Sequence, residues 1–124
     1  MTLRLPLLLI GAAMLANSAT PFACDRNALT AEARKRHFDE LGPKLRTIHQ
    51  TIRELPDGYD FQFPVDAAPL VWEWAAGERL CCPFFDVGVR FEREGGGLWL
   101  RLTGREGVKA FIRADFAPWF QTAK

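Results

Sequence analysis

The sequence predicts a small α+β domain with the element order α-β-α-β-β-α, in which helices cover a three-stranded, mostly antiparallel sheet. Two observations predict this class. Apolar residues recur at three- and four-residue steps in some stretches and at every second residue in others, which are the periods of helices and strands. The chain has 124 residues, 48% hydrophobic and 25% charged, which suits one globular domain with its own core. We expect this domain at residues 24–124, after a leader at residues 1–23.

The first helix should begin after Thr30, a favourable N-cap, with Glu32 in the first turn where the helix dipole favours a negative charge. An apolar stripe of helical period then continues along the chain. The pair Gly42-Pro43 interrupts this stripe, so we expect a kink there or two helices. The residues of the stripe are Leu41, Leu45, Ile48, Ile52 and Leu55.

A turn, a strand and a second helix follow. The "DG" pair at 57–58 is typical of a turn, and the next stretch, "YDFQF", alternates apolar and polar residues as a strand does. Asp66 is the expected N-cap of the second helix. Because a proline disfavours helical geometry at the residue before it, Pro83 predicts that this helix ends at Cys81 or just before Cys82.

Two strands and a last helix complete the domain. In "FDVGVRFE" and "LWLRLT" every second residue is apolar, and the intervening "EGGG" is typical of a hairpin loop. Thr103 and Glu106 have the spacing of a capping box, which predicts the start of the last helix. The expected inward-facing residues are Phe85, Val87, Val89 and Phe91 in the first strand, Leu98, Leu100 and Leu102 in the second, and Val108, Phe111 and Ile112 in the helix.

The leader has the three-part layout of a secretory signal peptide: a positive start, an apolar run, and small or polar residues before Cys24. The apolar run is short for a membrane span, which needs about 20 residues. We therefore predict an exported protein, periplasmic or secreted, with a cut after Ser18. Three alternatives stay open: an uncleaved anchor, a misassigned start codon that would leave the protein in the cytoplasm, and a lipoprotein acylated at Cys24. Pro21 and Phe22 match the lipoprotein pattern poorly.

Charge and motifs exclude several classes of function. The net charge is +1 and the chain has no basic stripe, which argues against nucleic acid as a partner because phosphate contacts need clustered Lys and Arg. The sequence contains no Ser-His-Asp order, no phosphate-binding glycine loop and no His-Glu-x-x-His motif. No familiar catalytic site is therefore indicated.

The clearest chemical signal is "GERLCCPFFDV" at 77–87. Cys81 and Cys82 are adjacent at a helix end, and Glu78 lies one turn back on the same face, so the three side chains can reach one ion. Thiolates favour zinc and softer ions such as copper(I) or mercury(II), and a carboxylate can complete a zinc shell. Cys24 would add a third thiolate, with Glu78 or His37 as the fourth ligand. The sequence therefore predicts a non-enzymatic metal-binding protein.

Other interpretations of the three cysteines remain open. The protein can be a thiol-dependent redox or detoxification enzyme, with Cys82 as a reactive thiolate beside Arg79 and Cys81 or Cys24 as the resolving thiol. It can instead be a secreted structural domain in which a disulfide joins Cys24 to Cys81 or Cys82, because thiols tend to oxidise outside the cytoplasm. Finally, buried cysteines can simply pack in a core.

Four segments, "ACDRNALT", "ELPDGYDFQFP", "ERLCCPFFDVGVRFE" and "LWLRLTGREGVKAFI", resemble an uncharacterised family of small bacterial proteins. Its members combine a cysteine near the domain start with a Glu-x-x-Cys-Cys-x-Phe segment, and related proteins are found near heavy-metal-responsive regulators. Many members begin just before the first cysteine, so the leader is a departure. The resemblance covers roughly residues 23–116 and implies heavy-metal handling. The site residues that it implies are Cys24, Glu78, Cys81 and Cys82, with His37 beside them.

Overall fold

The computed structural model describes residue 2 and residues 20–122. The expected signal peptide and its cut after Ser18 therefore lie largely outside the described residues. Within them, the domain is α+β, as the sequence predicts, and its sheet has four antiparallel strands in the order β1-β2-β4-β3. The strands are β1 (Ile52–Leu55), β2 (Gly58–Phe63), β3 (Asp86–Phe91) and β4 (Leu98–Thr103).

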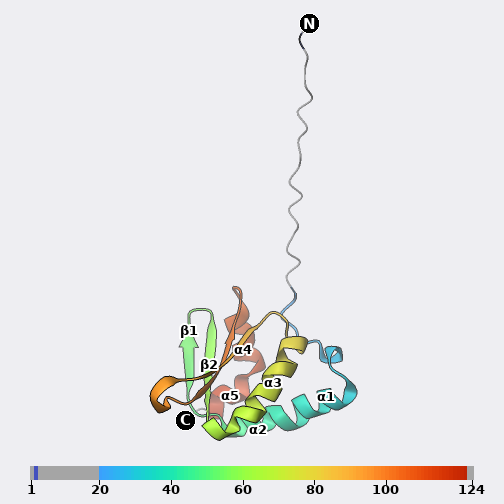
Figure 1. Cartoon of the computed structure of the whole chain (residues 1–124). Coiled ribbons are helices and arrows are strands. Elements are labelled where there is room, and N and C mark those ends of the chain that lie inside the picture. The colour runs from blue at the N-terminus through green and yellow to red at the C-terminus, as the bar shows by residue number, and fades with distance from the viewer. Residues whose placement is uncertain (1, 3–19, 123–124) are drawn as a thin grey trace.

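The helices gather beside the sheet, and Figure 1 shows α3 slanting away from the line of α1 and α2. Three short 3₁₀ turns lie at Arg26–Ala28, Val65–Ala67 and Arg93–Gly95. The helical segments are α1 (Ala31–Lys35), a π-helical segment (Arg36–Leu41), α2 (Gly42–Ile48), α3 (Ala68–Cys81), α4 (Val108–Asp115) and α5 (Ala117–Thr122).

The first helical run starts where the sequence predicts and changes its winding at the expected place. The Thr30 hydroxyl accepts a hydrogen bond from the Ala33 N–H at 3.2 Å, so the predicted N-cap is confirmed. Pro43 has no N–H for the usual helical bond. The turn before it widens, and the Gly42 N–H bonds to the His37 carbonyl, five residues back. The predicted interruption at Gly42-Pro43 is therefore a π-helical segment that separates α1 from α2.

The sheet prediction was wrong by one strand, because the apolar stripe was extended too far as a helix. The helix ends at Ile48, and His49 takes an extended conformation with ψ 152°. β1 then pairs with β2 through a tight turn at residues 56–57. Leu55 precedes a proline, which disfavours helical geometry, and the β-branched Ile52 suits a strand. The spacing of Ile52 and Leu55 fits a helix, but hairpin pairing decides their structure.

Both remaining cap predictions were wrong. Asp66 lies in a 3₁₀ turn, and α3 begins at Ala68 without a side-chain cap. Thr103 is still in β4, and α4 begins at Val108 after Gly107, whose φ of 96° favours glycine. The end of α3 at Cys81 is as predicted. α5 was not predicted.

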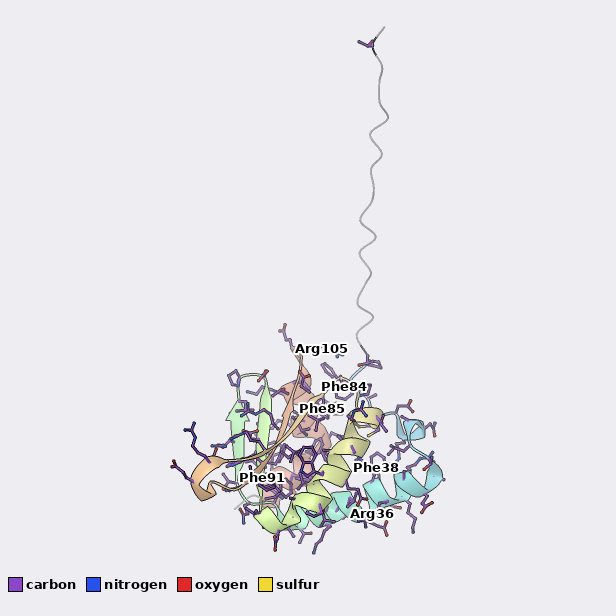
Figure 2. The ribbon with its side chains drawn as sticks, viewed as in Figure 1. Arg36, Phe38, Phe84, Phe85, Phe91 and Arg105 are labelled. Atoms are coloured by element: carbon purple, nitrogen blue, oxygen red, sulfur yellow. A yellow bond between two sulfur atoms is a disulfide. The ribbon has the colours of Figure 1, made fainter. Side chains whose placement is uncertain are left out.

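One face of the sheet packs against the helices and forms the core. Phe61 is fully buried, and its ring centroid lies 6.0 Å from that of Phe116 and 5.5 Å from that of Trp119. Burying side chains of this size stabilises the fold by about 1.5–3 kcal/mol each. Phe91, expected to face inward, is 55% exposed at the end of β3 (Figure 2). The buried residues of the apolar face are Tyr59, Phe61, Phe63, Leu98, Leu100 and Leu102.

Candidate metal centre

Two segments that are far apart in the sequence meet at the end of α3. The Asp25 N–H donates a hydrogen bond to the Cys81 carbonyl at 2.7 Å, which places Cys24 beside the last turn of the helix. The Phe22 ring packs edge-on against Phe84, with centroids 5.2 Å apart. Figure 2 shows Phe84 and Phe85 at this end of α3. The Asp25 hydrogen bond and the apolar packing at Phe22 together position Cys24.

The proline after the cysteine pair shapes the helix end. The Cys82 N–H still bonds to the Glu78 carbonyl at 2.8 Å, but Cys82 itself has left helical geometry, with φ −123° and ψ 69°. Pro83 favours this change at the residue before it. As a result, the two sulfur atoms turn toward each other, and Cys81 Sγ lies 3.8 Å from Cys82 Sγ.

The structure brings four of the five predicted site residues together. The ligand atoms of Cys24, Glu78, Cys81 and Cys82 all lie within 4.8 Å of one another. Cys81 Sγ is 3.6 Å from the nearer carboxylate oxygen of Glu78, as expected for side chains one helical turn apart. Cys81 and Cys82 are fully buried and Glu78 is 2% exposed, whereas Cys24 is half-buried. A cation in this group would be shielded from solvent.

In this structure Cys24 and Cys82 form a disulfide, with their Cα atoms 4.8 Å apart. Of the two partners that the sequence left open for Cys24, the structure therefore has Cys82. Cys81 is a free, buried thiol next to the bond. The predicted reactive thiolate at Cys82 is not available in this state.

His37, the fifth predicted residue, contacts the group through Glu78. Its Nε2–H donates to Glu78 Oε2 at 2.8 Å, and Nε2 is 3.9 Å from Cys81 Sγ. The ring stacks on Trp74 with centroids 5.3 Å apart. On another side, a Cβ at position 77 would lie 2.6 Å from His37 Nδ1, so only glycine leaves room for the ring. His37 is thus held in one orientation, and it holds Glu78.

Gly77 was missed in the sequence, whereas Trp74 was expected to face inward on this helix. The available signal was Gly77 itself, because a glycine inside a helix costs about 1 kcal/mol relative to alanine and implies a packing reason. His37 Nδ1 is buried and has no hydrogen-bond partner among the described residues. Aromatic stacking and close packing, rather than a second hydrogen bond, therefore position the imidazole.

Burial raises the pKa of two side chains in the group, Glu78 and Cys81. Desolvation raises the pKa of Glu78, and the His37 hydrogen bond offsets this only in part. Burial, followed by the nearby Glu78 charge, raises the pKa of the Cys81 thiol to about 12. At neutral pH Cys81 is therefore a thiol, and a soft cation that binds it must displace the proton.

Comparisons with known proteins leave the function to be argued from this geometry. No family model, curated protein or solved structure matches the chain. Within residues 20–122, no helix is long and apolar enough to cross a membrane.

Proposed function

We propose that this protein binds one soft metal ion through Cys24, Cys81 and Cys82, with Glu78 as the fourth ligand. The observation that carries the proposal is the convergence of these four side chains, whose ligand atoms lie within 4.8 Å of one another although Cys24 and Cys82 are 58 residues apart. The resemblance to small bacterial proteins near heavy-metal regulators points to the same residues. Heavy-metal handling is the role that we propose for this site.

Two spacings inside the group agree with ligands of a single tetrahedral ion, and the bonded sulfurs of Cys24 and Cys82 must separate before both can bind it. With bonds of about 2.3 Å to sulfur and about 2.1 Å to oxygen, tetrahedral ligands are about 3.8 Å apart for two sulfurs and about 3.6 Å for sulfur and oxygen. The Cys81–Cys82 sulfur separation is 3.8 Å, and Cys81 Sγ lies 3.6 Å from Glu78 Oε2. Three thiolates and one carboxylate suit zinc, and sulfur-rich sites also take copper(I) and mercury(II).

His37 supports the site as an orienting residue. Ligands in metal sites are commonly held by a hydrogen-bond partner outside the coordination sphere, which fixes their direction. The His37 Nε2–H bond to Glu78 has this geometry at 2.8 Å. Because a carboxylate oxygen has two lone pairs, Glu78 Oε2 can accept the His37 bond and still face the ion.

Metal binding by this set requires the reduced protein. The Cys24–Cys82 disulfide ties up two of the three sulfur ligands, so oxidation removes most of the site and reduction restores it. Disulfides persist outside the cytoplasm, which supports the prediction of an exported protein. We propose that the protein is exported and meets its ion in the dithiol state.

A second candidate function is thiol–disulfide exchange, favoured by the third thiol 3.8 Å from the sulfur of Cys82. In that step Cys81 Sγ would bond to Cys82 Sγ, and Cys24 would leave as a thiolate that takes up the proton lost by Cys81. The raised pKa of Cys81, about 12, leaves very little attacking thiolate at neutral pH. Metal binding is therefore the proposed function. Slow alkylation of Cys81 at neutral pH is expected, and fast alkylation would favour exchange.

The proposal is tested by titrating zinc(II) and mercury(II) into the reduced, full-length protein and following the thiolate-to-metal absorption band. We expect one ion per chain. Cys81→Ser should weaken binding at least 100-fold, and it leaves the Cys24–Cys82 pair in place. Arg79→Ala, an exposed neighbour on the same helix, should bind like the wild type. Equal binding by the Cys81→Ser and wild-type proteins would contradict the proposal.

A further inference from the structure

A pocket of about 230 Å³ opens onto the proposed metal site. Cys24 and Glu78 line it, whereas the fully buried Cys81 and Cys82 do not. A ligand that comes from solvent therefore meets the half-buried Cys24 and the carboxylate of Glu78 first. The pocket is the access route that a closed site of this kind needs.

The pocket is larger than a single ion requires. A water molecule occupies about 30 Å³ of liquid, so 230 Å³ corresponds to several waters, and a cavity of about 150 Å³ in another protein holds a benzene molecule. A metal ion held between Cys24 and Glu78 in the pocket wall and the buried Cys81 and Cys82 behind it fills only a small part of this space. The space therefore fits a group that arrives attached to the ion.

The walls of the pocket are aromatic. Trp74, Phe116 and Trp119 line it and are 3%, 5% and 7% exposed, and Phe38 forms part of the mouth. The Trp74 centroid lies 6.0 Å from that of Phe116 and 6.2 Å from that of Trp119, so the rings form one continuous wall. Surfaces of this kind bind apolar groups by burial and by ring-to-ring contact.

Charge narrows the class of ligand further. Two carboxyl groups, Glu78 and Asp115, line the pocket, and Arg46 is the basic residue at its exposed rim. Anionic carriers such as glutathione, which bears two carboxylates, are disfavoured beside them. A cation with an apolar substituent satisfies the thiols, the carboxyl groups and the aromatic wall together.

We propose that the pocket binds the organic group of a monosubstituted organometal cation, in which a soft metal carries one small alkyl or aryl group. The metal would bind the thiolates, and the organic group would take the position on the metal that Glu78 fills around a bare ion and would lie against Trp74, Phe116 and Trp119. This inference rests on the proposed metal site and names its ligand class. It predicts that affinity depends on the organic group when the metal is the same.

The test compares methylmercury and phenylmercury on the reduced, full-length protein, each in competition with the same free dithiol. Because the phenyl ring buries more apolar surface in the pocket, we expect phenylmercury to bind about tenfold more tightly than methylmercury relative to the dithiol. Gly42 lines the pocket, and a Cβ there would lie 3.2 Å from the His37 carbonyl oxygen and 3.9 Å from Trp74 Nε1, so Gly42→Leu should fill the space after a small shift of the backbone. This variant should lose the phenyl preference and keep methylmercury binding.

The control is Gly88→Leu, on the opposite face of the sheet, where a Cβ meets only Arg101 Cβ at 3.7 Å. It should keep the phenyl preference. Equal relative affinities for the two organomercurials would overturn the inference but leave the metal site standing, whereas no binding of either would overturn both. Mercury(II) supplied as its glutathione complex should enter without glutathione, and retention of glutathione on the protein would also overturn the inference. If Gly42→Leu does not fold, the ratio of phenylmercury to methylmercury affinity in the wild-type protein decides whether the inference holds.

Discussion

Two buried carboxylates, on opposite faces of the sheet, have very different surroundings. Asp60 is 1% exposed, and Arg101 donates to both of its oxygens at 3.0 and 2.9 Å. Arg53 and Arg90 approach the same carboxylate at 3.8 and 3.9 Å. Glu78 is 2% exposed, and among the described residues its one ion-pair partner is His37. One carboxylate is balanced by the protein's own cations, and the other is short of positive charge.

The difference indicates what each carboxylate does. A buried charge is tolerated when it is paired and hydrogen-bonded, so the Asp60 cluster is explained by the stability of the sheet. Desolvation raises the pKa of Glu78, which shows that its own surroundings do not fully stabilise the charge. Three sulfur atoms lie next to it. A soft cation would supply the missing charge, and on this ground we propose that the group at the end of α3 is a metal site.

The largest expected effect comes from neutralising each carboxylate in turn. Asp60→Asn should lower the free energy of unfolding by about 2 kcal/mol, because it removes charge-assisted hydrogen bonds to Arg101. Glu78→Gln should change the stability of the metal-free protein by less than about 0.5 kcal/mol while weakening zinc binding. Urea unfolding measures the stability of each variant, and zinc titration measures its zinc affinity. A larger loss of stability in Glu78→Gln than in Asp60→Asn would contradict the different roles assigned to the two carboxylates.

His37 provides the next prediction, on affinity. His37→Phe keeps an aromatic ring against Trp74 but removes the Nε2–H bond to Glu78, so zinc affinity should fall about tenfold. His37→Gln retains an amide donor and should recover part of this loss. Zinc affinity measured by competition with a chelator decides the matter. Equal affinities for wild type and His37→Phe would show that Glu78 does not need this partner.

Phe22 tests how Cys24 is positioned. Because the Phe22 ring packs against Phe84 and Phe111, Phe22→Ala should lower stability by about 1–2 kcal/mol. Phe91→Ala, at a side chain 55% exposed, should change it by less than about 0.5 kcal/mol. Thermal unfolding of both variants provides the measurement. Acylation of Cys24 requires cleavage just before it, which removes Phe22, so a large Phe22 effect argues against the lipoprotein alternative.

The smallest expected effect is on the stability of Asp115→Asn, and this effect depends on pH. Desolvation raises its pKa in the folded protein above the unfolded value of about 3.9. Between the unfolded and folded pKa values, the folded state holds more protons than the unfolded state. The contribution of Asp115 to stability therefore falls as the pH rises through this range, and it stays lower at higher pH. Asp115→Asn should be slightly more stable than wild type at pH 7 and should show a flatter stability profile above pH 4. A steeper profile would contradict this.

Local rules predicted much of the fold and part of the site. The helix end at Cys81 follows from Pro83, and the approach of Glu78 to Cys81 follows from helical spacing. β1 was missed because the spacing of Ile52 and Leu55 fits a helix until pairing with β2 is known. The caps at Asp66 and Thr103 failed because neighbouring 3₁₀ and strand structure extended past them.

The rest of the site depends on contacts across the sequence. Cys24 reaches Cys82 over 58 residues, guided by Phe22 packing that no local pattern encodes. His37 reaches Glu78 over 41 residues, through a space that only Gly77 leaves open. The imbalance between Asp60 and Glu78 becomes visible only when the cations around each are placed in space.

The most direct test is elemental analysis combined with thiol counting on the full-length protein, prepared reduced with zinc(II) and then oxidised. The account predicts one zinc per chain in the reduced protein, with all three cysteines protected from alkylation. On oxidation it predicts release of the ion, one free thiol at Cys81 and the Cys24–Cys82 bond. Reduced protein that holds no more zinc than Cys81→Ser, with its cysteines open to alkylation, would contradict the central claim.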